Sequence, residues 1–144
     1  MKKVKTRRSI VISVMTIIVV TLTVSAATIY ASDDNIGYKF RIGTYYDNSQ
    51  EPDGRYRQTL KKENPWKVNL KSSEEGKGTI TTFWLEDRFF INVSYERNAK
   101  QGAGAYYTEA LNEASDKMVY LTAQNNNWSS VAYVVEGIWD EETW

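Results

Sequence analysis

The 144-residue sequence contains no cysteine and no histidine. Without cysteine the chain can form no disulfide and no thiolate nucleophile, and it lacks the lipid-modified cysteine of a bacterial lipoprotein. Without histidine it lacks the commonest general base and the commonest metal ligand, which excludes serine–histidine–acid triads and zinc hydrolase sites. We therefore expect a fold stabilised by its core alone, with no cofactor and no metal site.

Signatures of phosphate and calcium binding are also missing. The run at 102–104 (GAG) lacks the rest of the dinucleotide-binding fingerprint, so we interpret it as a hinge in a loop. The segment 47–53 (DNSQEPD) offers oxygen ligands of the type that calcium prefers, but its spacing does not match a helix–loop–helix calcium site. We interpret it as an acidic surface turn.

The chain begins with an arrangement typical of a signal peptide. Five basic residues lie among the first eight, an apolar segment extends over Ile10–Val24, and small residues follow up to Ala31. We expect residues 1–31 to direct export and to be cleaved after Ala31, or after Ala27, which leaves residues 32–144 as a secreted, extracellular domain. The alternative is an uncleaved anchor, since a span needs roughly 20 apolar residues and the uncharged segment is long enough.

The predicted leader changes the charge balance. The full chain has 18 basic and 18 acidic side chains, and the leader holds five of the basic ones and none of the acidic ones. Residues 32–144 therefore carry 13 basic and 18 acidic side chains, a net charge of −5. Because a mildly acidic domain has no general attraction for phosphate backbones, we expect no nucleic-acid partner. We expect contact with a membrane only through the leader.

Short segments of alternating polar and apolar residues, rich in aromatic and β-branched side chains, recur through residues 32–144 and predict β-strands. Apolar residues at helical spacing from Tyr107 to Ala114 predict one short amphipathic helix. The sequence thus predicts a mainly β fold, a single antiparallel β-sandwich or partly closed barrel with one short helix, after an N-terminal signal helix. The expected strands are Tyr38–Tyr46, Arg55–Leu60, Trp66–Leu70, Thr79–Leu85, Arg88–Glu96, Met118–Gln124 and Ser130–Ile138.

Paired carboxylates could cleave glycans, as in glycosidases, where the two groups lie roughly 5–9 Å apart. Any chain with 18 acidic residues supplies candidates, and most carboxylates are solvated surface charges. We therefore assign no catalytic residue and expect the protein not to be an enzyme. The candidate acids are Glu86, Asp87, Glu96, Glu136 and Asp140.

Aromatic side chains offer a different chemistry, because tryptophan and tyrosine combine a large apolar face with a polar group. The tryptophans could stack on sugars together with Tyr45, Tyr46, Tyr106 and Tyr107. A core without disulfides also needs large side chains, which we expect from Trp66, Phe83, Phe89 and Tyr133. The candidate binding residues, chosen beside turns and near the C-terminus, are Trp128, Trp139 and Trp144, with Asn126 and Asp140 to hydrogen-bond sugar hydroxyls.

Short motifs are spread over residues 32–144, among them Tyr56-Arg57-Gln58-Thr59, Asn64-Pro65-Trp66-Lys67-Val68, Phe83-Trp84-Leu85 and Gly137-Ile138-Trp139-Asp140. These motifs resemble those of a family of small secreted proteins from Gram-positive bacteria. That family has no assigned function, so the resemblance implies export and a single domain but supplies no catalytic residues. A looser analogy is to bacteriocins of the lactococcin type, which are also exported and fold as small β-sandwiches.

The leading hypothesis is a secreted bacterial protein that is not an enzyme and binds a cell-wall glycan, a surface protein or a second copy of itself. A bacteriocin-like secreted toxin or signal is the first alternative, and a carboxylate-dependent glycan hydrolase is the second. Killing of neighbouring cells by the purified protein would favour the first alternative. A cleft with paired acids would favour the second.

Overall fold

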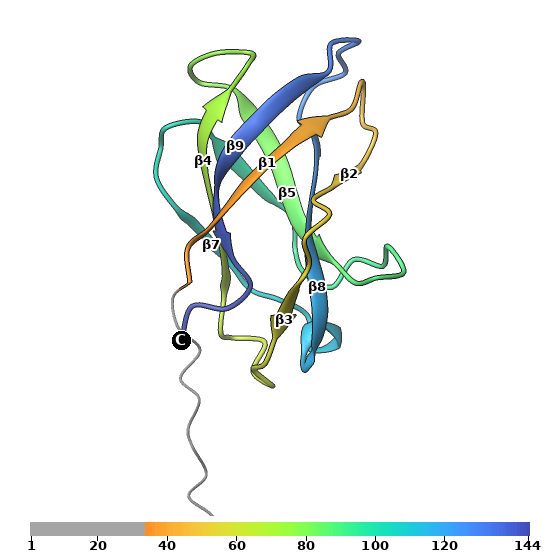
Figure 1. The fold of residues 1–144 in the computed structure, drawn as a ribbon, viewed down its shortest axis with the longest axis vertical. Coiled ribbons are helices and arrows are strands. Elements are labelled where there is room, and N and C mark those ends of the chain that lie inside the picture. Colours follow the sequence, from red (N-terminus) through yellow and green to blue (C-terminus); the bar gives the residue numbers. More distant parts are fainter. Residues whose placement is uncertain (1–33) are drawn as a thin grey trace, which may run out of the picture.

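The computed structural model describes residues 34–144, so the predicted leader, residues 1–31, lies outside the described part of the chain. Two antiparallel sheets form a sandwich (Figure 1). The expected β-sandwich is confirmed, and the sheets do not close into a barrel. One sheet has the order β1 (Ile36–Ile42), β9 (Tyr133–Asp140), β4 (Trp66–Ser73) and β7 (Tyr106–Thr108). The other has the order β2 (Ser49–Gln50), β8 (Lys117–Asn125), β5 (Ile80–Glu86) and β6 (Arg97–Lys100), and β3 (Arg55–Arg57) pairs with β8.

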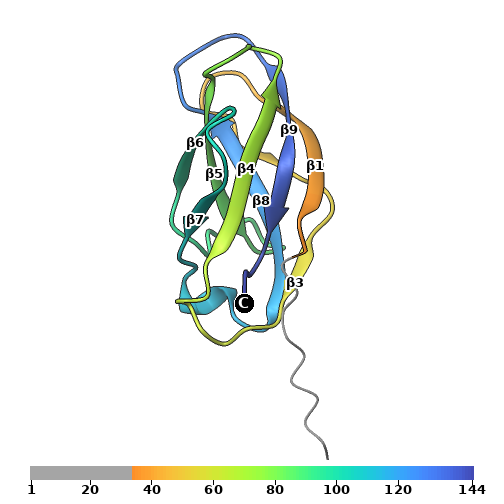
Figure 2. The same ribbon diagram turned by 90° about the vertical axis from the view of Figure 1, so that its left-hand side faces the viewer.

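β1 and β9 bury alternate side chains between the two sheets, as the sequence pattern predicts, whereas β5 is buried along nearly its whole length. Figure 2 shows β4, β9 and β1 side by side in one layer, with β5 and β8 in the layer behind them. Both sheets and their shared core are built from residues 36–140. Trp66, Phe83 and Tyr133 are buried as expected, together with Ile42, Val68, Leu70, Leu85, Leu121, Val135 and Trp139.

The expected helix is reduced to a single 3-10 turn, Asn112–Ala114. Tyr107 lies instead in β7, where it pairs with Lys67 of β4 and its side chain is exposed. The backbone that a helix would use is bound elsewhere, because the Leu111 N–H donates to the Val93 carbonyl oxygen at 2.8 Å. A helix this short gains little from its own hydrogen bonds, so pairing with distant segments prevails. Among residues 34–144, no helix has the length and apolar character needed to cross a bilayer.

The expected strand over Arg88–Glu96 is wrong, because the chain forms a tight turn directly after β5. Phe89, expected in the core, is 64% exposed. The Asp87 carboxylate accepts the N–H groups of Phe89 and Ile91, which removes both amides from any strand ladder.

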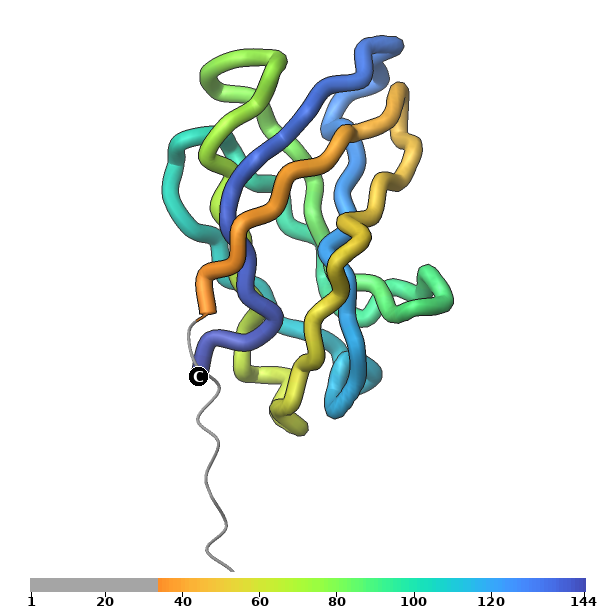
Figure 3. The backbone as a smooth tube through the Cα atoms, viewed as in Figure 1, coloured from red at the N-terminus to blue at the C-terminus, as the bar shows by residue number. Residues whose placement is uncertain are grey.

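The sandwich has two distinct ends. β1 and β9 pair so that Ile36 lies opposite Trp139 and Ile42 lies opposite Tyr133. We call the Ile36–Trp139 side the terminus end, because the described chain enters the fold and finishes there (Figure 3). We call the Ile42–Tyr133 side the far end. β5 begins at the far end, where Thr81 Oγ1 and Tyr133 Oη lie 3.0 Å apart, and it runs toward the terminus end.

Replacing Gly137 by alanine is expected to destabilise the fold strongly. A Cβ atom at this position of β9 would lie 2.0 Å from the Asn69 carbonyl oxygen of β4 and 2.7 Å from Tyr38 Oη. Because the β4 backbone must shift, urea unfolding should show a loss of about 3 kcal/mol in the free energy of unfolding. The control is Gly37→Ala, whose Cβ would lie 3.9 Å from its nearest neighbour. Equal losses in both variants would contradict the structure.

Candidate functional site

The structure separates the residues that the sequence grouped together. Trp128 is 71% exposed and precedes β9 at the far end, whereas Trp144 is 59% exposed and follows β9 at the terminus end. An eight-residue strand spans roughly 25 Å, so a single sugar ring cannot contact both. Trp139 and Asp140 are buried at the end of β9, so neither side chain presents a surface to a ligand.

The far end carries an aromatic cluster. Tyr45 and Tyr46, from the loop between β1 and β2, flank Trp128, from the loop between β8 and β9. Their ring centroids lie 4.5 and 5.4 Å from that of Trp128, and the rings are tilted relative to one another. All three side chains are exposed. We call these three residues the Trp128 cluster.

Hydrogen bonds hold the two loops of the Trp128 cluster in place. The Tyr45 N–H donates to the Ser129 carbonyl oxygen, which ties one loop to the other. In the first loop the Gly43 N–H donates to Ser49 Oγ at 3.0 Å. In the second loop the Asn127 N–H donates to Asn125 Oδ1 at 2.9 Å. Loops fixed before a ligand arrives reduce the conformational entropy that binding must overcome.

The backbone of Tyr45 is strained. Its φ angle is 57°, in the left-handed region that bulky residues avoid at a cost of order 1–3 kcal/mol. The ring is exposed, so burial in the core does not offset this cost. Backbone strain at an exposed aromatic residue is typical of a binding or functional loop.

Polar groups border the Trp128 cluster. The candidate Asn126 is half-buried, and its Oδ1 accepts a hydrogen bond from Thr82 Oγ1 at 3.2 Å, so this side chain supports the loop. Aromatic faces bordered by amides and hydroxyls suit a ligand that presents apolar faces and hydroxyl groups together, as sugars do. The exposed polar residues next to the three rings in sequence are Asp47, Asn48, Asn127 and Ser130.

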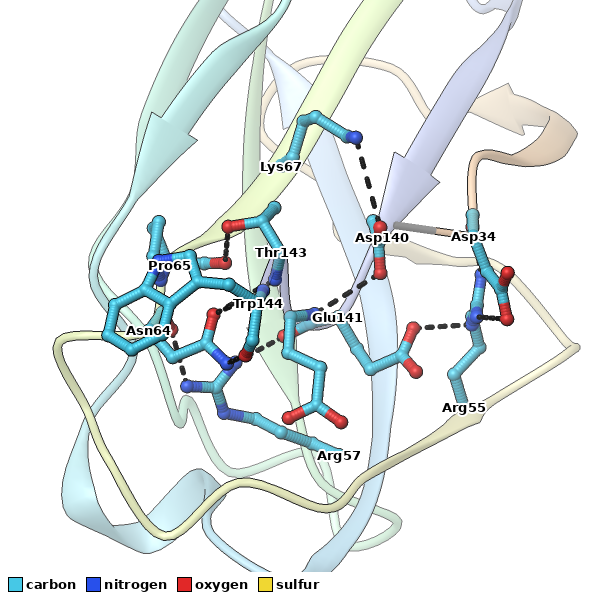
Figure 4. A network of polar contacts seen from close by, with 11 residues as sticks. Asp34, Arg55, Arg57, Asn64, Pro65, Lys67, Asp140, Glu141, Thr143 and Trp144 are labelled. Carbon is cyan, nitrogen blue, oxygen red and sulfur yellow. Dashed lines mark hydrogen bonds and ion pairs between the residues drawn. The ribbon is translucent and has the colours of Figure 1, made fainter. Parts of the chain in front are cut away.

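At the terminus end a buried polar network fastens the C-terminal residues to the loop after β3 (Figure 4). Arg57 is fully buried and donates to the carbonyl oxygens of Lys61 at 3.0 Å, Asn64 at 2.6 Å and Glu141. Burial lowers the pKa of the Arg57 guanidinium, and the charges of Glu142 and Glu141 raise it in part. This arginine joins backbone segments and has no surface for a ligand.

The same network holds Trp144 by its backbone. Asn64 Oδ1 accepts the N–H groups of Thr143 at 2.9 Å and of Trp144 at 3.2 Å, and Asn64 Nδ2 donates to the Trp144 carbonyl oxygen. Lys61 Nζ lies over the Trp144 ring, 5.9 Å from its centroid. The exposed ring of Trp144 therefore already has a cation on one side.

An ion pair adds the start of the described chain to the network. Arg55 contacts the Glu141 carboxylate and donates to the Asp34 carbonyl oxygen at 2.7 Å. Burial raises the pKa of Glu141, while a backbone hydrogen bond and the charge of Arg55 lower it in part. The network thus joins β3 to both ends of the described chain.

The candidate acids are engaged in structural contacts, except for the exposed Glu96. The buried Glu86 carboxylate accepts hydrogen bonds from Trp84 Nε1 at 3.0 Å, Thr122 Oγ1 at 2.9 Å and Gln50 Nε2 at 3.1 Å. Within residues 34–144, no three acidic side chains gather in a way that could hold a metal ion. The remaining partners are Lys117 for Asp87, Lys39 for Glu136 and Lys67 for Asp140.

The turn after β5 is an exposed apolar feature that was not expected from the sequence. Phe89, Phe90 and Ile91 are three consecutive apolar residues that follow the charged pair Asp87 and Arg88. A half-buried strand alternates, so three apolar residues in a row after an acidic residue was the signal that could have revealed a turn.

A family model described as "Protein of unknown function (DUF2712)" matches residues 23–143, which include every strand of the sandwich. The chain belongs to this family. The expected membership of a family without an assigned function is confirmed to that extent. The DUF2712 match includes the Trp128 cluster and nearly all of the network at the terminus end. No curated protein and no solved structure matches the chain.

Replacing Arg57 by methionine should show that the network is structural. Methionine fills much of the same space but leaves the buried carbonyl oxygens without their donor, so we expect the free energy of unfolding to fall by about 3 kcal/mol. Arg41→Met, at an exposed position of β1, should change it by less than about 0.5 kcal/mol. Urea unfolding of both variants measures the difference. A small loss for Arg57→Met would show that the network contributes little to stability.

Proposed function

We propose that this protein is a secreted bacterial binding protein, not an enzyme, that holds a cell-wall glycan on the Trp128 cluster. The observation that carries the proposal is the exposure of Trp128, which stays 71% accessible although two tyrosine rings pack beside it. A large indole ring exposed to water in a fixed loop is a typical anchor for a ligand.

The geometry supports a sugar as the ligand. The rings of Tyr45 and Tyr46 are tilted against Trp128 by 39° and 55°, so the three rings do not form one flat plane. Such a surface contacts the apolar faces of a sugar chain, while nearby amides and hydroxyls meet its hydroxyl groups. Binding to loops that are already ordered needs little rearrangement.

The charge supports a neutral glycan over an anionic polymer. The acidic Asp47 lies next to Tyr46 in the Trp128 cluster. Like charges repel at low ionic strength, so an anionic wall polymer such as teichoic acid would bind this cluster less readily. The glycan strand of peptidoglycan is the ligand that we propose.

The absence of catalysis is part of the proposal. The buried Glu86 accepts three hydrogen bonds, and Asp140 is enclosed at the terminus end, so both acids already serve the fold. The Trp128 cluster lies at the opposite end of β5 and β9 from these two acids. We propose recognition by stacking and hydrogen bonding, with no bond broken.

Trp128→Ala should weaken binding to soluble peptidoglycan fragments at least tenfold, because it removes the central stacking ring. Isothermal titration calorimetry measures the affinity, and a pull-down with intact peptidoglycan provides a second assay. Trp144→Ala is the matched control, since it removes an equally large exposed ring at the terminus end and should change the affinity less than twofold. Loss of binding in both variants, or in neither, would refute the proposed site.

Export is tested separately. When the full chain is expressed in a bacterial host, mass spectrometry of the culture medium should find a protein that begins at Ser32, or at Thr28 for the earlier cleavage site. A full-length chain recovered only from membranes would contradict release and favour the anchor.

A further inference from the structure

The turn after β5 exposes three apolar side chains in a row. Phe89 is 64% exposed, Phe90 69% and Ile91 58%. In Figures 1 and 3 the green segment after β5 projects away from the sandwich, beyond β8. We call residues 88–91 the apolar tip. Neighbouring exposed apolar residues are rare on soluble proteins unless they contact a partner or a membrane.

Asp87 fixes the shape of the apolar tip. Its Oδ1 accepts the Phe89 N–H at 2.8 Å and the Ile91 N–H at 3.2 Å, and its carbonyl oxygen accepts the Phe90 N–H at 3.0 Å. The Asp87 N–H in turn donates to the Ile91 carbonyl oxygen at 3.0 Å. Desolvation opposes ionisation of Asp87, but these backbone hydrogen bonds and Lys117 lower its pKa below the usual value. The carboxylate therefore stays ionised and keeps the turn closed at neutral pH.

This internal hydrogen bonding prepares the apolar tip for a water-poor environment. Backbone N–H groups without partners are costly to transfer out of water. The N–H groups of Phe89, Phe90 and Ile91 all have partners within the turn. Transfer of this turn to an apolar phase thus leaves none of the three donors unpaired.

Phe90 carries a further cost. Its φ angle is 62°, which a bulky residue rarely adopts and which glycine would adopt without strain. The ring is exposed, so it contributes little to the core. The fold would tolerate glycine at this position better than phenylalanine, so the ring itself has a use at the surface.

We propose that the apolar tip inserts into the interfacial region of an anionic lipid bilayer. The tip is convex and projects from the body, which suits insertion between lipid headgroups. Arg88 is exposed beside it, with its guanidinium 4.6 Å from the Phe89 ring, and it forms no ion pair with residues 34–144. A cation at this depth attracts anionic headgroups. This goes beyond the expectation that the chain meets a membrane only through its leader.

The apolar surface continues beside the tip. A pocket of ≈ 360 Å³ lies between the apolar tip and the half-exposed pair Tyr56 and Met118. Lys117 on the pocket wall is already paired with Asp87, so Arg88 is the cation that the tip offers to a headgroup.

The test is cosedimentation of residues 32–144, which contain the complete sandwich without the leader, with lipid vesicles. Phosphatidylglycerol vesicles should bind the protein at least tenfold more tightly than phosphatidylcholine vesicles. Phe90→Gly should weaken binding to phosphatidylglycerol at least tenfold while its melting temperature stays equal or rises, since glycine relieves the strain. Phe89→Ser is a second variant that leaves the backbone of the turn unchanged. Trp128→Ser, at the far end, should bind vesicles as the parent protein does.

The outcomes separate this proposal from the glycan site. Loss of vesicle binding in Phe90→Gly with unchanged peptidoglycan binding supports the membrane tip independently of the Trp128 cluster. The proposal is overturned if the parent protein does not bind vesicles. It is also overturned if Phe90→Gly and Phe89→Ser bind vesicles as tightly as the parent protein does. Analytical ultracentrifugation without lipid tests whether the tip instead binds a second copy of the chain. A dimer of the parent protein that dissociates in Phe90→Gly would assign the tip to that interface and would also overturn the proposal.

Discussion

Burial of large side chains between two sheets is the interaction on which the whole structure depends. The chain has no cysteine and therefore no disulfide, so Trp66, Phe83, Tyr133 and Trp139 supply much of the apolar area that holds the sheets together. A domain of this size has a free energy of unfolding of only about 5–15 kcal/mol, so the strained loops at either end persist only while this core stays intact. The close approach of β9 and β4 at Gly137 shows how little free space the packing leaves.

The two ends of the sandwich use polar groups in opposite ways. At the terminus end, Arg57 and Asn64 are buried and their hydrogen-bonding groups meet backbone groups of the C-terminal segment. At the far end, hydrogen bonds fix loops whose aromatic rings remain in water. Within residues 34–144, the non-glycine residues with positive φ are Tyr45, Phe90 and Asp116, and all three lie at the Trp128 cluster or around the apolar tip. Strain is thus located at exposed positions, and the core stability offsets it.

The sequence predicted the fold class because alternation is a local signal. Trp66–Leu70 alternates as a half-buried strand does, Thr79–Leu85 is rich in β-branched and aromatic residues, and both lie in strands of the sandwich. The prediction failed for Arg88–Glu96, where a side-chain cap from Asp87 overrides strand propensity, and for the helix near Ala110, where pairing with distant residues prevails. The expected last strand, Ser130–Ile138, stops one residue before the buried Trp139, a candidate binding residue. Continuing the alternation of Tyr133 and Val135 would have turned it inward.

The site was harder to predict, because its parts are far apart in the chain. Trp128 was chosen for its neighbouring asparagines, but nothing local indicates that Tyr45 and Tyr46, more than 80 positions earlier, would pack beside it. The capture of Trp144 by Asn64 is likewise a contact between segments 80 residues apart. Composition indicates which side chains can bind a ligand, and the pairing of β1 with β9 and of β2 with β8 brings them together.

The pairing of β1 with β9 also governs how the domain is displayed. With Ile36 opposite Trp139, β1 and β9 run antiparallel at one edge of their sheet. The described chain therefore starts and finishes at the same end of the sandwich. If the domain were tethered through either end of the described chain, the far end, with the rings of the Trp128 cluster, would point away from the tether. The strand order therefore fixes which end of the sandwich faces away from a tether, whether the tether is at the start or at the finish of the described chain.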